Sequence, residues 1–246
     1  MASAKTAGII IIGDEILTGK VQDTNTFFLA KELWSRGISV CRASVIPDIT
    51  EVIALEVRDF SERFDFVFTS GGIGPTHDDI TIEGISQAFG VKTVISDVLK
   101  GSMERRHKNL TPAQLKMAEV PEGAELIDDN GLTFPLIKFR NVYIFPGIPE
   151  LLYRKFHAVG DRFNGPRIFL SKVYFNESES VLAPRLDEIV GLNNGVKIGS
   201  YPVIDKSEYT VMVTLESIDA AALDSAVQLL LAKVPAEKVV RVVRPE

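Results

Sequence analysis

The chain has 246 residues, a hydrophobic content of 46% and a formal net charge of -6 at pH 7. A chain of this length can bury a sizeable core, and one large domain with a smaller companion is a common arrangement. The acidic balance excludes a dominant nucleic-acid surface, which needs clustered Lys and Arg, so we expect no nucleic-acid partner. Arg105, Arg106 and Lys108 form the densest basic group, a pattern typical of a solvated helix face.

The single cysteine, Cys41, cannot form an intramolecular disulfide, as is usual in a reducing compartment. It falls in an apolar run, so we expect a buried thiol without a catalytic role. The N-terminal apolar run, Ala7–Ile12, is too short for a transmembrane span and lacks the cleavage region of a signal peptide. These features predict a cytoplasmic protein with no membrane partner, and a homo-oligomer is compatible with them.

In the first part of the chain, short β-branched runs alternate with helical stretches, a pattern typical of βαβ units that build a parallel sheet. Strands are predicted at 7–12, 38–46 and 65–69, and helices at 24–36 and 50–63. Phe27, Phe28, Leu33 and Trp34 supply a buried stripe for the first helix, and Gly37 supplies its stop. The strand runs are nearly continuous in apolar residues, as expected where both faces of a sheet are covered.

The later part of the chain indicates a boundary between two domains. A polar helical region at 98–118 precedes strands at 136–139 and 142–145, a helix at 150–163 and a linker at 164–166. From Arg167 onward the order is strand, helix, strand, strand, helix, strand, the βαββαβ arrangement of ferredoxin-like domains. The predicted fold is therefore α/β, with a three-layer, mostly parallel sheet domain at 1–164 and a small α+β domain at 165–246.

The first group of candidate ligand-binding residues follows the first predicted strand. It comprises Gly13, Asp14, Glu15, Asp23 and Asn25. Ligands of open α/β sheets bind outside the carboxyl ends of the strands, where these residues are placed. The alternative is that Asp23 or Asn25 caps the next helix and that Asp14 and Glu15 are turn residues.

The second group follows the third predicted strand and comprises Ser70, Gly71, Gly72, Gly74, Pro75, Thr76 and His77. Glycines let a ligand approach the backbone, and the start of the following helix offers unpaired N–H groups, so the segment resembles a phosphate cradle. It is neither a Walker loop nor a dinucleotide fingerprint, and a tight turn without ligand is the alternative.

Asp78 and Asp79 end this second group, beside the glycines, where they should repel a bare phosphate. A divalent cation such as Mg, Mn or Co resolves the conflict, because it binds carboxylate and phosphate oxygens together. Asp79, Asp78 and Asp14 are the predicted metal ligands. The alternative is that Asp79 caps a helix beginning near Ile80 while Asp78 faces water. A third turn contributes Gly147, and Glu150 at a helix start either joins the site or interacts with the helix dipole.

Three segments together, GDEILTGKVQDTN, GGIGPTHDD and PGIPEL, resemble the molybdopterin-binding-type domain of molybdenum-cofactor enzymes, CinA-like proteins and eukaryotic FAD synthases. Members that act on molybdopterin typically carry Arg before the loop aspartate, where this chain has Asp78. The CinA-like and FAD synthase versions are closer. Nothing in the 246 residues resembles the PAPS-reductase-like domain that performs FAD synthesis or the amidohydrolase domain of many CinA-like proteins, so we expect neither activity.

This resemblance implies a divalent-metal-dependent pyrophosphatase that releases AMP from FAD or ADP-ribose. It further implies a small-molecule nucleotide substrate and no organic cofactor, with Asp79, Asp78, Asp14 and Glu150 as the candidate catalytic residues. Two alternatives stay open. One is a module that binds molybdopterin or a nucleotide without turnover, and the other is a regulatory domain associated with FAD synthesis.

Overall fold

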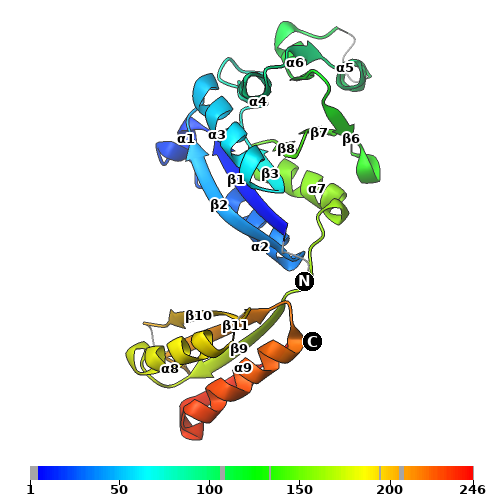
Figure 1. Ribbon diagram of the computed structural model, residues 1–246. Helices are drawn as coiled ribbons and strands as arrows, with labels where there is room; N and C mark the ends of the chain where they lie inside the picture. The colour runs from blue at the N-terminus through cyan, green and yellow to red at the C-terminus, as the bar shows by residue number, and fades with distance from the viewer. Residues whose placement is uncertain (1–4, 106–108, 133, 194, 205–207, 246) are drawn as a thin grey trace. The chain divides into compact units, whose positions relative to one another are not determined.

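The computed structural model describes residues 5–105, 109–132, 134–193, 195–204 and 208–245 (Figure 1). Arg106 and Lys108 of the basic group lie outside these residues, so the expectation about that group is not addressed by the structure. The chain divides into two compact units, Met1–Gly165 and Pro166–Glu246, and each has its own buried core. No helix in the described part of the chain is long and apolar enough to cross a membrane.

The larger unit is built on a six-stranded sheet with the order β2-β1-β3-β8-β7-β6. Its strands are β1 (Lys5–Ile12), β2 (Ile38–Ile46), β3 (Phe66–Ser70), β6 (Glu125–Ile127), β7 (Leu136–Phe139) and β8 (Val142–Phe145). The pairs β1/β2, β1/β3 and β3/β8 are parallel, whereas β7/β8 and β6/β7 are antiparallel. The carboxyl ends of β1, β2, β3 and β8 therefore meet at one edge, as the sequence predicted for a mostly parallel sheet.

Helices cover both faces of this sheet. Alternate side chains of β1 point to opposite sides, and both sets are apolar, so each face has to be buried. Ile10 and Ile12 pack into the core beneath α3 (Thr50–Arg63) and α4 (Thr81–Phe89). Ile9 and Ile11 belong to a second core with the buried faces of α2 (Asn25–Ser35) and α7 (Pro149–Val159). The result is the three-layer α/β arrangement expected from the sequence, seen in Figure 1.

Short elements complete the larger unit and differ from the sequence prediction. The region predicted as one helical stretch contains two helices, α5 (Asp97–Glu104) and α6 (Pro112–Lys116), flanked by an antiparallel pair, β4 (Thr93–Ile95) and β5 (Glu119–Pro121). One-turn helices occupy Asp14–Leu17 (α1), Asp129–Gly131 and Gly160–Arg162, the last following α7 where the prediction extended that helix to Phe163. Three-residue strands and single turns carry too little periodicity to be predicted from sequence.

Two burial predictions were wrong. Cys41 is exposed, because β2 is the edge strand of the sheet and its centre is covered less than a central strand would be. Phe27 is 74% exposed, and the stripe of α2 that packs into the core is formed by Leu29 and Leu33. A continuous apolar run predicts a strand, but it does not tell an edge strand from a central one.

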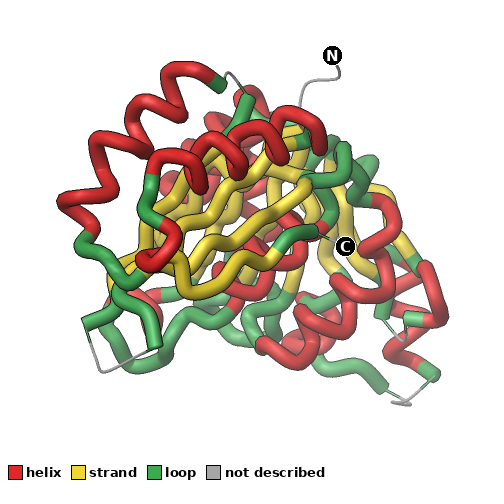
Figure 2. The backbone as a smooth tube through the Cα atoms, turned by 90° about the horizontal axis from the view of Figure 1, so that it is seen from below, coloured by secondary structure: helices red, strands yellow, loops and turns green. Residues whose placement is uncertain are grey.

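The smaller unit follows the predicted βαββαβ order. It contains β9 (Phe169–Phe175), α8 (Glu179–Leu192), β10 (Lys197–Pro202), β11 (Val211–Ser217), α9 (Ala220–Lys233), a 3-10 turn (Ala236–Lys238) and β12 (Val239–Val243). The four-stranded sheet has the order β10-β11-β9-β12 with antiparallel neighbours. Leu186 of α8 and Leu230 of α9 pack with Val213 and Phe175 of the strands. Figure 2 shows helices (red) packed along strands (yellow). The predicted fold class is confirmed.

Candidate functional site

The first and second predicted residue groups lie on neighbouring parallel strands. Gly13 follows β1 and Gly71 follows β3, and the two strands are paired in register from Ala7 with Phe66 to Ile11 with Ser70. The turn after β8 carries Gly147 at the same edge, since β8 is the next strand along. The prediction that these loops lie side by side at the carboxyl edge is confirmed.

Three glycines are required by close backbone approach at this edge. Gly71 has φ +110°, and a Cβ there would lie 2.0 Å from the Ile12 carbonyl oxygen. Gly72 has φ +64°, and its Cβ would lie 2.2 Å from the Thr81 hydroxyl oxygen. A Cβ on Gly147 would sit 3.3 Å from the Gly71 Cα. A side chain at Gly71 would collide with the end of β1, one at Gly72 would displace the Thr81 side chain at the start of α4, and one at Gly147 would be in tight contact with Gly71.

Asn25 joins three loops of the site. Its side-chain amide donates to the Ser70 hydroxyl at 3.0 Å and to the Gly147 carbonyl at 2.8 Å. The Ser70 hydroxyl in turn donates to the Pro146 carbonyl at 3.2 Å. Asn25 is only 6% exposed, and its Oδ1 is buried without a hydrogen-bond partner. Because Gly147 supplies a carbonyl, the amide orientation is fixed and Oδ1 remains an unused acceptor inside the site.

Asp23 has the structural role that the sequence left open as an alternative, which is to cap the start of the next helix. Its Oδ1 accepts the backbone N–H groups of Asn25 at 2.9 Å and Thr26 at 3.0 Å. These two N–H groups belong to the first turn of α2, so the carboxylate satisfies donors that a helix start leaves unpaired. Asp23 therefore fixes the start of the helix that carries Asn25.

Asp79 folds the glycine loop onto itself. Its Oδ1 accepts the Gly74 N–H at 2.6 Å, and its Oδ2 accepts the Thr76 N–H at 2.7 Å and the Thr76 hydroxyl at 2.5 Å. The alternative that Asp79 caps the following helix is wrong, because α4 has Ile80 at its N-cap and no side-chain cap. Pro75 lies exposed between the two bonded residues. The carboxylate thus holds the loop in one shape.

Asp48 is a site residue that the sequence reasoning missed. It follows β2, and its Oδ2 accepts the Asp14 backbone N–H at 2.9 Å. Burial raises the pKa of Asp48, and the charges of Asp14, Glu15 and Asp78 raise it further, against the lowering effect of the Asp14 hydrogen bond. Four carboxylates therefore share one electrostatic neighbourhood. The rule that placed loops after β1 and β3 in the site applies equally to the loop after β2.

The outer part of the glycine loop faces solvent. The His77 side chain is 97% exposed, and its Nδ1 lies 3.8 Å from Asp78 Oδ1. The pKa of Asp78 is lowered by hydrogen bonding within the turn from Thr76 to Asp78, with smaller effects from the charges of His77 and Lys116. Asp78 is therefore an exposed, ionised carboxylate at the mouth of the loop.

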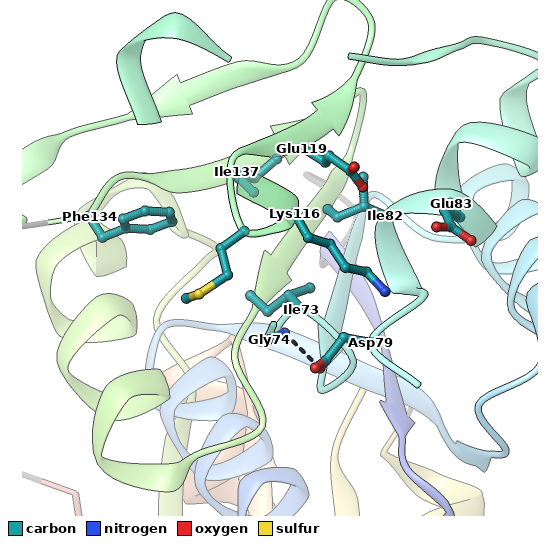
Figure 3. Close-up of a pocket in the computed structure, with 10 residues that line it drawn as sticks. Ile73, Gly74, Asp79, Ile82, Glu83, Lys116, Glu119, Phe134 and Ile137 are labelled. Carbon is teal, nitrogen blue, oxygen red and sulfur yellow. Dashed lines mark hydrogen bonds between the residues drawn. The ribbon is translucent and has the colours of Figure 1, made fainter. Parts of the chain in front are cut away.

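Lys116 is the second residue missed by the sequence reasoning. Its ammonium group donates to the Thr76 carbonyl at 2.9 Å, so it reaches the glycine loop from α6, 40 positions away along the chain. A cavity of about 20 Å³ lies beside it, between the glycine loop and apolar side chains that include Ile73, Phe134 and Ile137 (Figure 3). That volume holds about one water, so any larger group must bind on the open side of the loop.

Two glutamates face this cavity as well. Burial raises the pKa of Glu119, the negative charge of Glu83 raises it further, and Lys116 lowers it. Both carboxylates line the cavity with Asp79 on its opposite wall (Figure 3). Glu150, the remaining predicted acid, is exposed in the first turn of α7 after Pro149. It belongs to the same sheet edge, and no contact joins it to the other described acids.

The carboxylates at this edge suit a hydrated cation better than a closed metal cage. Among the residues that the structure describes, no three His, Cys, Asp or Glu side chains come together to hold a metal. Mg²⁺ usually binds through one or two carboxylates, several waters and substrate phosphates. Asp48 has one oxygen free of the Asp14 bond, and the mutual repulsion of Asp48, Asp14, Glu15 and Asp78 is what a cation would relieve. The residues present therefore fit a divalent ion of that kind.

Comparison with known proteins identifies a family match for each of the two units. Residues 8–165 match the family described as a probable molybdopterin binding domain, and residues 167–243 match the FAD synthase middle domain. A protein of Archaeoglobus fulgidus is 37% identical over 220 residues, covering 89% of this chain and 94% of that protein. A Caenorhabditis elegans protein named probable FAD synthase is 30% identical over 259 residues, covering 94% of this chain and 50% of the relative. The chain thus spans about half the length of that relative.

A solved structure agrees with the sequence comparisons. The protein CinA from Thermoplasma acidophilum, described as of unknown function, matches with a TM-score of 0.60 and 32% identity over 65% of this chain and 99% of that one. The matched share corresponds in size to the larger unit, which carries the glycine loop and the acidic group. The chain therefore belongs to the family of molybdopterin-binding-type domains, and it carries this domain together with a match to the middle domain of FAD synthase.

Proposed function

We propose that the larger unit hydrolyses a nucleotide diphosphate in a divalent-metal-dependent reaction, converting FAD to FMN and AMP or cleaving ADP-ribose with release of AMP. The observation that carries this proposal is the Asp48 carboxylate, which lies close enough to Asp14, Glu15 and Asp78 to be repelled by each, beside a glycine loop at the carboxyl edge of the sheet. Acidic groups next to a phosphate-sized backbone cradle are reconciled by a cation that binds both.

The cation itself would neutralise the diphosphate and lower the pKa of a bound water. Asp48 with one of its acidic neighbours, Asp14 or Asp78, would hold it together with waters, because none of the three forms an ion pair with Lys or Arg among the described residues. The unused Oδ1 of Asn25 is a further acceptor at this edge, to which a buried water could donate a hydrogen bond.

The glycine loop would hold the phosphate oxygens. Asp79 consumes the N–H groups of Gly74 and Thr76, whereas the N–H groups of Gly72 and Ile73 have no acceptor among the described residues. Backbone donors that are already positioned stabilise charge without reorganisation. We assign Asp79 to shaping the loop. It could also bind a metal, as the sequence predicted, but only through carboxylate lone pairs that accept no hydrogen bond from the loop.

Lys116 would supply positive charge from the other side. It contacts the loop through the Thr76 carbonyl and acts electrostatically on Asp78. An ammonium group is a compact point charge that can rotate between a carbonyl and a phosphate oxygen. We therefore assign Lys116 to substrate binding in the proposed reaction.

A second candidate function is a module that binds molybdopterin or a nucleotide without turnover. The observation favouring it is that no three acidic, His or Cys side chains of the described chain are already arranged around a metal. A regulatory role beside FAD synthesis is a form of the same candidate, because the relatives named probable FAD synthase are about twice as long as this chain.

Incubating the purified chain with FAD or ADP-ribose and Mg²⁺, Mn²⁺ or Co²⁺, and measuring AMP, separates the two candidates. The hydrolase proposal expects AMP that depends on the metal and on Asp48. Nucleotide binding with no AMP above a metal-free background would instead support the binding module.

A further inference from the structure

A groove lies at the edge of the main sheet opposite the glycine loop. Its volume is about 480 Å³, and it is bounded by the last turns of α3 and α4 and by the turn that joins β7 to β8. That turn, Arg140 and Asn141, precedes β8, so the groove opens at the amino ends of the parallel strands, whereas the glycine loop follows their carboxyl ends. Ligand sites commonly have volumes of about 300–1,000 Å³.

Two guanidinium groups line this groove without a carboxylate partner. Arg58 uses its Nε to donate to the Ala88 carbonyl at 2.9 Å, which leaves both Nη groups without an acceptor among the described residues. The Arg140 side chain makes no hydrogen bond or ion pair with any described residue. Its guanidinium lies over the Phe89 ring at 4.5 Å and the Phe139 ring at 5.9 Å. A guanidinium that contacts aromatic rings and no carboxylate keeps its N–H groups available to an anion.

Arg140 also has a strained backbone. Its φ is +52°, in the left-handed region where Gly and Asn are the usual residues of a two-residue hairpin turn. An Arg in this region costs roughly 1 kcal/mol compared with glycine. Strain at an exposed residue that makes no ion pair points to a use for its side chain, because the turn itself would be better served by glycine.

The neighbouring turn residue is fixed by hydrogen bonds. The Asn141 side chain donates to the Ser61 carbonyl at 3.0 Å and to the Phe64 carbonyl at 2.8 Å, and it accepts the Ser61 hydroxyl at 2.6 Å. The turn is thereby tied to the end of α3, which carries Arg58. The two guanidiniums are therefore presented from connected, ordered elements rather than from independent loops.

We propose that this groove binds a phosphorylated small molecule of up to mononucleotide size, with its phosphate held between Arg58 and Arg140. Glu62 also lines the groove and forms no ion pair with either arginine. Together with the C-termini of α3 and α4, Glu62 weakens the positive potential of the groove, so we expect binding to require both guanidiniums. The site is separate from the diphosphate site and does not rest on the proposed hydrolysis.

The test is a site-resolved NMR titration of the whole chain with inorganic phosphate and with AMP, without added metal, following the backbone amides of Phe89 and Asn141. Both ligands should shift these amides. Arg58→Gln and Arg140→Gly should each weaken binding by about tenfold or more, whereas Glu62→Gln should strengthen it several-fold. Arg63→Gln is the matched control, because Arg63 already pairs with Asp59 on the same helix and binding should not change.

Arg140→Gly also separates a binding role from a structural one. Glycine relieves the left-handed strain, so thermal stability should stay unchanged or rise while phosphate binding falls. Loss of stability in Arg140→Gly together with wild-type phosphate binding in Arg58→Gln would overturn the proposal. The same conclusion would follow if phosphate and AMP left the Phe89 and Asn141 amides unshifted.

Discussion

The carboxylate of Asp48 accepts the backbone N–H of Asp14 at 2.9 Å, and this bond joins the loops that follow β2 and β1. Asp48→Asn keeps an oxygen that can accept the same N–H, so thermal stability should stay close to wild type. Metal-dependent AMP release should nevertheless fall about a hundredfold, because the charge that balances a cation is lost. Metal affinity by calorimetry and AMP release are the measurements.

A matched control for this change is Asp187→Asn, an exposed position on α8 of the smaller unit. It alters the net charge of the chain by the same amount and should leave both quantities unchanged. Wild-type AMP release in Asp48→Asn would remove Asp48 from the site.

Asp79 should be more than a metal ligand, because its carboxylate accepts three hydrogen bonds within the glycine loop. Asp79→Ala leaves the N–H groups of Gly74 and Thr76 without acceptors, so we expect a stability loss of about 2 kcal/mol and AMP release reduced at least a hundredfold. Chemical denaturation and the AMP assay measure the two effects. Thr76→Ala removes only one of the three hydrogen bonds, that of the Thr76 hydroxyl, and should show a smaller loss in both assays.

Lys116→Met should affect substrate binding more than turnover. The ammonium group contacts the loop at Thr76, and its charge is expected to act on the substrate phosphates before and during the reaction. An interaction made equally with substrate and transition state appears in KM, so KM should rise about tenfold while kcat changes little. Lys116→Arg should recover part of the affinity. A kcat loss with unchanged KM would contradict the assigned role.

A pH effect on stability is expected from Lys155 in α7. Its ammonium group donates to the carbonyls of Phe134 and Pro135, and burial lowers its pKa from 10.5 to about 8. The unfolded chain therefore binds more protons than the folded chain between about pH 8 and 10.5, so the free energy of unfolding rises with pH across that window. At lower pH both states are protonated and the cost of burying the charge is fully present.

The corresponding measurement compares the wild type with Lys155→Met at pH 7.5 and pH 9.5. The wild type should gain about 2 kcal/mol of stability relative to the variant between these two pH values. The difference between the two proteins isolates Lys155 from other titrating groups. An equal pH dependence in both would show that this lysine is not desolvated in solution.

Much of the fold could be predicted from sequence, because the period of the apolar residues and the turn residues agree along most of the chain. The strands at Ile38–Ile46 and Val142–Phe145 and the helix at Thr50–Arg63 begin and end where the pattern predicts. Cys41 shows the limit, because local sequence does not tell which strand lies at a sheet edge.

The parts of the candidate site that directly follow parallel strands could be predicted from the sequence. Loops after β1, β3 and β8 could be placed at one edge, and the glycines needed there were identified by type. Asp48 carries the same positional signal after β2, in the sequence Ile46, Pro47, Asp48, and a uniform application of the strand-end rule would have found it. Lys116 could not be found in this way, since its contact with Thr76 depends on the path of α6, which no local pattern determines.

The central claim is metal-dependent hydrolysis of a nucleotide diphosphate, and the most direct measurement is turnover of FAD in ¹⁸O-labelled water with Mn²⁺ or Mg²⁺, analysed by mass spectrometry. Hydrolysis predicts equal amounts of FMN and AMP, one ¹⁸O atom in one of the two products, and no reaction after chelation of the metal. ADP-ribose run in parallel identifies the preferred substrate. Unchanged FAD and ADP-ribose with every metal, from protein that binds either nucleotide, would contradict the claim.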